Sequence, residues 1–161
     1  ENGLKIGDEY TSDQYFDSLK NDYIAPFSDE NPKFAVVCRY NLQLSMLKEI
    51  LEKKGKKVFI ISGEVKNRDE IVQEIEKTDE CIVLLQADCA IGFEIPSVPI
   101  MLFASLSFSF VAHEQSIGRI HRINKLKKNV YQYLLIKGGV DEAVYDCIMK
   151  KQDFNIAIYK K

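Results

Sequence analysis

Short apolar runs alternate with amphipathic helical patterns along most of the sequence. The first run, Phe34 to Cys38, has no polar side chain, which is typical of a strand buried on both faces. Alternation of such strands with helices predicts an α/β domain in which helices cover both faces of an open parallel sheet. The expected strands are 34–38, 58–61, 81–85, 99–103 and 130–136, and the expected helices are 8–27, 41–54, 67–77, 109–124 and 140–151.

Apolar stripes predict which face of each helix packs inward. A polar linker is expected at 28–32, and Asn67 to Glu70 has the spacing of a capping box for the third helix. The stripes of the first two helices are Tyr15, Phe16, Leu19, Tyr23 and Ile24, and then Leu42, Met46, Leu47, Ile50 and Leu51. Ile71, Ile75 and Val72 are expected to face inward from the third helix, and Val144, Cys147 and Ile148 from the last.

The composition is that of an ordinary globular domain with a core of its own. The chain has 161 residues and a net charge of −2, so any nucleic-acid binding must depend on a local patch. Lysine-rich stretches occur at 53–57, 125–128 and 150–151, and the first is interpreted as a solvated helix end. No signal peptide and no membrane-spanning apolar run are evident, so an intracellular, cytoplasmic location without a membrane partner is expected.

Cysteine usage gives no indication of a metal site. None of the four cysteines forms a CxxC pair, and neither histidine is near one in sequence. We therefore expect buried free thiols rather than zinc ligands or disulfides.

Polar side chains follow the expected strands, where a parallel sheet binds its ligands. These segments are 39–41, 62–64, 86–92 and 104–107.

One helical segment carries a Q-x-x-G-R-x-x-R pattern beyond the last of these edges. In a helix, Gln115, Arg119 and Arg122 lie at i, i+4 and i+7 on one face, while Ile117 and Ile120 can pack inward. Two guanidiniums with little acid beside them favour an external anion, and phosphate is the natural candidate. The alternative is that both arginines are surface cations or pair within the chain.

This pattern resembles motif VI of superfamily 2 helicases and translocases, and the resemblance to their second RecA-like lobe covers 31–154. In that motif the glutamine and arginines face ATP bound to the other lobe. The resemblance therefore implies that Arg122 is the arginine finger, that Arg119 reaches the phosphates, and that Gln115 binds ATP. His121 to Lys125 is similar to the His-Arg-Ile-Gly-Gln ending of the Swi/Snf subgroup, with Gly and Gln replaced.

Further segments match the family more loosely. Ala90 to Pro96 resembles motif V, in which Gly92 matches and Glu94 takes the place of an acid or amide that touches the ribose or motif VI. Gln86 stands where relatives often have a threonine on the nucleic-acid backbone. The ends of the first two strands, with Arg39, Asn41, Ser62 and Gly63, resemble segments along the nucleic-acid track.

The resemblance implies the C-terminal motor lobe of an ATP-dependent DNA helicase or translocase. Residues 1–30 would then be an N-terminal helix and linker, and 31–161 the helicase C-terminal domain. ATP and Mg²⁺ would be held mainly by the N-terminal RecA-like lobe of the same parent protein, since the sequence has no GxxxxGK[ST] loop. The isolated domain is therefore expected to be inactive, and DNA is expected as partner in preference to RNA.

Three alternatives stay open at this point. One is an RNA helicase lobe of DEAD-box type. Another is a stand-alone α/β module that binds a phosphorylated ligand. In the third, a structural domain, the arginines only pair with acids, and loss of Arg119 would destabilise the fold.

Overall fold

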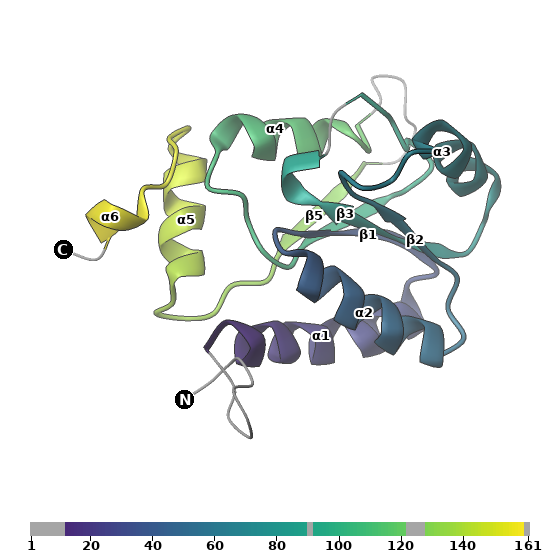
Figure 1. Ribbon diagram of the computed structural model, residues 1–161, viewed down its shortest axis with the longest axis horizontal. Helices are drawn as coiled ribbons and strands as arrows, with labels where there is room; N and C mark the ends of the chain where they lie inside the picture. Colours follow the sequence, from purple (N-terminus) through teal and green to yellow (C-terminus); the bar gives the residue numbers. More distant parts are fainter. Residues whose placement is uncertain (1–11, 90–91, 122–127, 160–161) are drawn as a thin grey trace.

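A computed structural model describes residues 12–89, 92–121 and 128–159 (Figure 1). Strands and helices alternate as expected. The strands are β1 (Lys33–Cys38), β2 (Val58–Ile61), β3 (Cys81–Gln86), β4 (Ile100–Phe103) and β5 (Val130–Tyr133). The helices are α1 (Ser12–Glu30), α2 (Asn41–Lys53), α3 (Arg68–Lys77), α4 (Phe110–Gly118), α5 (Val140–Met149) and α6 (Ile156–Tyr159), with a short 3₁₀ turn, η1 (Ala87–Cys89).

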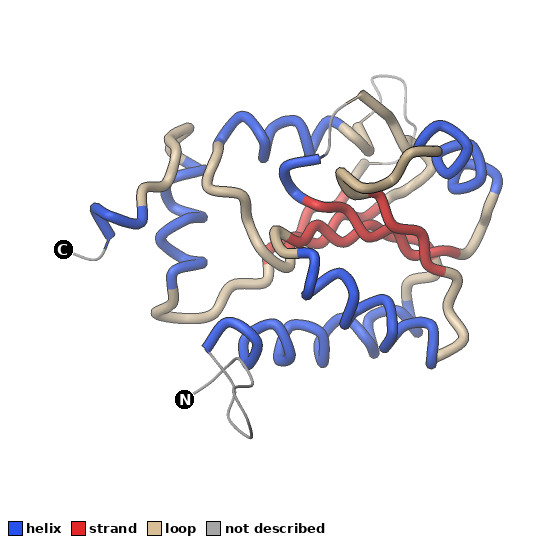
Figure 2. Tube along the Cα trace, in the orientation of Figure 1, coloured by secondary structure: helices blue, strands red, loops and turns tan. Residues whose placement is uncertain are grey.

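The five strands form one parallel sheet in the order β2-β3-β1-β4-β5. Strand β1 lies at the centre, where Val36 pairs with Leu84 of β3 and with Leu102 of β4. Figure 2 shows helices on both sides of this sheet. The predicted open α/β architecture is therefore confirmed.

Successive residues of β1 face two separate cores, because side chains alternate across a strand. Phe34 and Val36 pack with Ile24 of α1 and with α2 on one face. Val37 packs with Ile75 of α3, and α5 contributes to the same core on the other face. Both faces of the central strand are buried, which explains why it is apolar from Phe34 to Cys38; its first residue, Lys33, is polar.

Helix α2 is rotated relative to the predicted stripe. Leu42 is 48% exposed, whereas Gln43 is fully buried. Gln43 faces inward because its Oε1 accepts a hydrogen bond from Ser105 Oγ at 2.9 Å, beyond the end of β4. A buried polar contact of this kind gives no periodic signal in the sequence.

Helix α1 also differs from its prediction. It continues to Glu30, so residues 28–30 are helical and not a linker. Leu19 and Tyr23 are 42% and 48% exposed, while Lys20 is buried. Lys20 Nζ contacts Asp141 Oδ2 of α5 at 2.5 Å, and this distant partner explains why a charged residue replaces the expected apolar stripe.

The larger of the remaining boundary differences are at the ends of α4, β5 and α5. Helix α4 ends at Gly118, and residues 119 and 120 form a turn, so the predicted continuation to 124 is wrong for the described residues. Strand β5 ends at Tyr133 and helix α5 at Met149, both earlier than predicted.

Helix α3 is fixed mainly at its C-terminal end. Asn67 is the N-cap residue, yet its side chain accepts no capping hydrogen bond, so the predicted capping box is not formed. At the other end, the ammonium group of Lys33 donates to the carbonyl oxygens of Ile75 (2.8 Å) and Thr78 (2.6 Å). A cation at this end also suits the helix dipole. The inward face is as predicted, with Ile75 buried.

The remaining predictions on side-chain burial are largely confirmed. Val144 and Ile148 of α5 are buried, and Cys147 packs against the same core. All four cysteines are free, with Cys38 and Cys81 buried and Cys89 and Cys147 half-buried. Burial raises the pKa of the Cys81 thiol. None of the helices described is long and apolar enough to cross a membrane.

Candidate functional site

The ends of β2 and β3 are joined by a shared hydrogen-bond acceptor. Gln86 Oε1 accepts from the main-chain N–H of Gly63 and from the thiol of Cys89, each at 3.3 Å. Since the oxygen of the amide faces Gly63, its NH₂ group is the end left to face a ligand. Two residues predicted to bind nucleic acid, Gly63 and Gln86, therefore lie side by side.

Arg39, at the end of β1, lies with its guanidinium against aromatic rings. Its Cζ is 3.4 Å from the centre of the Phe108 ring and 5.3 Å from that of Tyr40. The main-chain N–H of Arg39 donates to Ser105 Oγ at 2.7 Å. Nη1 is buried and has no hydrogen-bond partner in the structure. The Arg39 guanidinium is therefore already packed against the rings of Phe108 and Tyr40. Any ligand would contact it in that packed position.

The other two predicted track residues differ in accessibility. Asn41 is the exposed first residue of α2. Ser62 is only 6% exposed, and its carbonyl accepts from Val65 N–H in the turn that follows β2 (3.2 Å). Asn41 and Gly63 are therefore presented more openly than Ser62.

The loop at 92–95 is shaped by Gly92. Its φ of +81° lies in the left-handed region that favours glycine. Phe93 and Ile95 then point into the core, whereas Glu94 between them is exposed. The positive φ explains why a glycine occupies this position of the predicted motif V. Glu94 remains accessible to a ligand.

Arg119 joins this loop to helix α4. Its Nε donates to the carbonyl of Gln115 at 2.8 Å, and Nη1 donates to the carbonyl of Phe93. In return, the main-chain N–H of Ile95 donates to the carbonyl of Arg119 at 2.7 Å. The segments predicted as motifs V and VI are therefore in direct contact, through backbone carbonyls rather than through acids.

Arg119 and Gln115 lie one turn apart at the end of α4, as predicted. Nε and Nη1 of Arg119 donate to the carbonyls of Gln115 and Phe93. Arg122, the predicted arginine finger, lies outside the described residues, and its assignment stays a prediction.

The N-terminal end of α4 is held by residues that the sequence analysis did not single out. Ser109 Oγ accepts from Ala112 N–H at 3.3 Å, and Asp153 Oδ1, from the C-terminal segment, accepts from Phe110 N–H at 2.8 Å. A serine before a helix is a recognisable cap, but the contribution of Asp153 depends on tertiary structure alone.

His113, in the same helix, is 2% exposed and was also not singled out. Its Nε2 shares a hydrogen bond with Tyr133 Oη at 3.1 Å, and its ring lies 4.8 Å from that of Phe103. Burial lowers the pKa of His113 and raises the pKa of Tyr133 to about 12. A lowered pKa favours the neutral imidazole, which lies on the buried side of the helix that carries Gln115.

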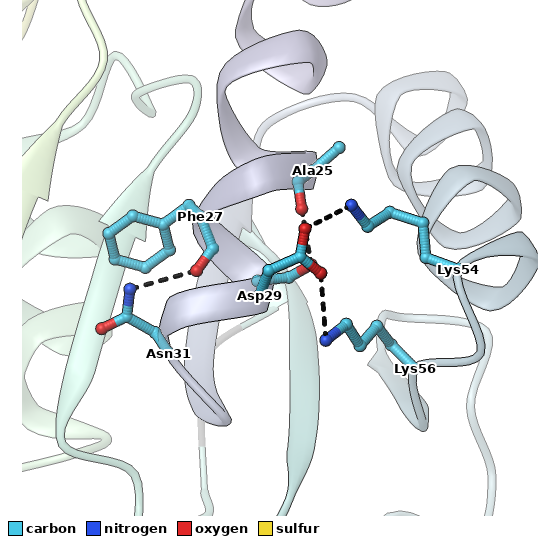
Figure 3. A network of polar contacts seen from close by, with 7 residues as sticks. Ala25, Phe27, Asp29, Asn31, Lys54 and Lys56 are labelled. Carbon is cyan, nitrogen blue, oxygen red and sulfur yellow. Dashed lines mark hydrogen bonds and ion pairs between the residues drawn. The ribbon is translucent and has the colours of Figure 1, made fainter.

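The lysine stretch at 53–57 lies at the amino-terminal ends of the strands, opposite to their carboxyl ends, because it immediately precedes β2. Lys54 and Lys56 contact the two carboxylate oxygens of Asp29 at 2.7 and 3.3 Å (Figure 3). Hydrogen bonds from these lysines lower the pKa of Asp29. Lys57 pairs with Glu74 at 2.7 Å. These cations thus have carboxylate partners within the chain, in agreement with their interpretation as a helix end.

Comparison with known proteins gives consistent results. The family model described as "Helicase conserved C-terminal domain" matches residues 16–124. The crystal structure of the C-terminal part of the Fun30 ATPase domain is similar with a TM-score of 0.70 at 16% identity, over 97% of this chain and 52% of that one. The C-terminal domain of the DEAD-box protein Dbp5 is similar with a TM-score of 0.67 at 17% identity, over 83% of this chain and 78% of that one.

No curated protein matches the sequence. The likeness to the Fun30 structure shows that the five-stranded parallel sheet has a RecA-like fold, as expected.

Proposed function

Because the chain belongs to the helicase conserved C-terminal domain family, we propose that it is the C-terminal motor lobe of an ATP-dependent DNA helicase or translocase. Arg122 is the arginine finger in this proposal, Arg119 contacts the phosphates, and Gln115 orients them. Gly92 and Glu94 form the supporting loop on the nucleotide side. The observation that carries the proposal is the junction of Arg119 with Phe93 and Ile95, which holds the two motif segments together.

In this proposal the chain supplies positive charge to the reaction, and it does not supply the loop that binds the nucleotide phosphates. Phosphoryl transfer is catalysed chiefly by positioning and by charge placed against the transferred group, and an arginine from a second lobe contributes roughly 10³–10⁵ in rate. An N-terminal RecA-like lobe of the parent protein would hold ATP and Mg²⁺. Hydrolysis then requires the two lobes to close, which couples ATP use to motion.

The nucleic-acid track is proposed along the carboxyl ends of β1, β2 and β3. Asn41 and Gly63 are exposed there, Arg39 and Gln86 are half-buried, and Ser62 supports them from a buried position. Main-chain N–H groups and the NH₂ of Gln86 are donors suited to phosphate oxygens. Such contacts are independent of sequence and sensitive to salt.

A Swi/Snf-type, DNA-directed motor is proposed on the basis of the His121 to Lys125 segment. The likeness to the Fun30 ATPase domain covers 97% of the chain, whereas the likeness to Dbp5 covers 83%. An RNA-directed motor of DEAD-box type is the second candidate. A parent protein stimulated by RNA and not by duplex DNA would favour it.

The test is ATP hydrolysis by the full parent chain, with DNA or RNA added, compared with its Arg122→Ala variant. The proposal expects nucleic-acid stimulation that depends on Arg122. The 161-residue chain alone is expected to show no hydrolysis above background.

A further inference from the structure

The ring of Phe93 contacts two guanidinium groups. Its ring centre lies 5.6 Å from Cζ of Arg119 and 5.8 Å from Cζ of Arg68, the first residue of α3. Both distances are within the range of a cation–π contact. The same residue also binds Arg119 through its carbonyl oxygen, which accepts from Nη1. The ring and the carbonyl oxygen of Phe93 therefore both contact the guanidinium of Arg119.

The surroundings restrict how far Phe93 can move. The residue is 7% exposed and belongs to the core that includes Ile75 and Ile120. Gly92, which precedes it, turns the chain with a positive φ, and Ile95 N–H is bonded to the Arg119 carbonyl. These contacts fix the loop whose Phe93 carbonyl accepts from Arg119 Nη1.

The second arginine extends this arrangement to α3. Arg68 and Gly92 both line a groove of about 510 Å³ with Lys66, Asn67 and Glu70. Each guanidinium is attracted by the negative face of an aromatic ring. Phe93 thus connects the start of α3, which follows β2 and its proposed nucleic-acid segment, with the end of α4.

We propose that Phe93 is a positioning residue that holds the Arg119 guanidinium at the end of α4 and links it to Arg68 of α3. It touches no reacting atom and acts through Arg119. The importance of this position for catalysis rests on the proposed function, but the positioning itself can be measured on the 161-residue chain alone.

The experiment measures solvent exchange of the Arg119 Nε–H by NMR, with the resonance assigned by its loss in Arg119→Lys. Phe93→Leu keeps an apolar side chain but removes the ring, and Phe93→Tyr keeps the ring. We expect Phe93→Leu to accelerate exchange about two- to fivefold, the range that corresponds to an exposed cation–π contact. Phe93→Tyr should keep the original rate. Ile148→Val, a core change in α5, controls for general loosening.

An unchanged exchange rate in folded Phe93→Leu would overturn the proposal, as would equal acceleration in Ile148→Val. Phe93→Met replaces Phe93→Leu if the latter does not fold. In the parent chain, Phe93→Leu should lower kcat for ATP with little change in KM, and Phe93→Tyr should restore it. Faster exchange without any effect on kcat would uphold the positioning and count instead against the proposed role of Arg119.

Discussion

Arg119 donates a hydrogen bond to the backbone carbonyl of Phe93, across 26 positions of sequence, and so fastens the end of α4 to the loop at 92–95. A second carbonyl, that of Gln115, accepts from the same guanidinium. Arg119 is consequently a structural residue in this domain as well as a proposed phosphate contact. The two roles require separate measurements.

Replacing Arg119 by alanine should destabilise the isolated chain by about 1–3 kcal/mol, because two carbonyls lose a charged donor. At this chain length, each kcal/mol corresponds to roughly 2–4 °C in Tm. Gln115→Ala is the matched control, since it keeps the backbone carbonyl and should leave Tm unchanged. Equal melting temperatures for Arg119→Ala and the native chain would show that the contacts do not form in solution.

Stability should fall when the pH drops below about 6.5, because His113 is held neutral in the folded state. Burial lowers its folded pKa below the ordinary value of 6.5, so the unfolded chain takes up the proton first. The contribution is present in full above pH 6.5 and is lost as the pH falls towards the folded pKa, with a slope of at most about 1.4 kcal/mol per pH unit.

Urea unfolding at pH 8, 6.5 and 5.5 measures this slope. His113→Gln should flatten it, whereas His121→Gln, at the other histidine of the chain and an exposed position, should not. A slope that survives in His113→Gln would assign the pH dependence to other groups.

Gln86→Glu should weaken DNA binding by the parent chain without altering stability. A carboxylate still accepts from Gly63 N–H but replaces the NH₂ donor with negative charge. The cost is on the order of 1 kcal/mol, or roughly fivefold in Kd.

Fluorescence anisotropy over a range of salt concentrations measures this effect. Lys54→Glu, a charge change at the opposite edge of the sheet, should leave Kd the same. If both variants weaken binding equally, the track does not run along the carboxyl ends of the strands.

The contact of Lys20 with Asp141 predicts that α1 is part of the folded domain. Their side chains are 5% and 20% exposed, and loss of one partner from a buried pair costs roughly 3–5 kcal/mol. Lys20→Met should approach the lower end of that range, since Asp141 keeps some contact with water. The double variant with Asp141→Asn should recover part of the loss in urea unfolding. A loss in the double variant equal to the sum of the losses in the two single variants would show that the pair is not coupled.

Sequence patterns predicted the parallel sheet because 34–38, 81–85 and 100–103 in β1, β3 and β4 are apolar on both faces, a property that is local to each strand. They did not predict which faces of α1 and α2 are buried. Lys20 and Gln43 are polar, and each is buried by one distant partner, Asp141 and Ser105 respectively. Such pairings depend on tertiary structure and leave no periodic signal.

The candidate site divides in the same way. The i, i+4 spacing correctly placed Gln115 and Arg119 on adjacent turns, but it gave no sign that Arg119 donates to carbonyls. The contribution of Phe93 was likewise hidden, since an apolar residue in a loop indicates only burial. His113 lies two positions from Gln115 and is identified only by the rings that surround it.

The central claim is most directly tested by nucleic-acid-stimulated ATP hydrolysis of the full parent chain with Arg122→Ala. Lys128→Ala, at an exposed cation close to it in sequence, is the control. We predict that Arg122→Ala lowers kcat by roughly 10³-fold or more, while Tm and DNA affinity hold and Lys128→Ala has the native rate. A native rate in Arg122→Ala would contradict the assignment of this domain as the lobe that supplies the arginine finger.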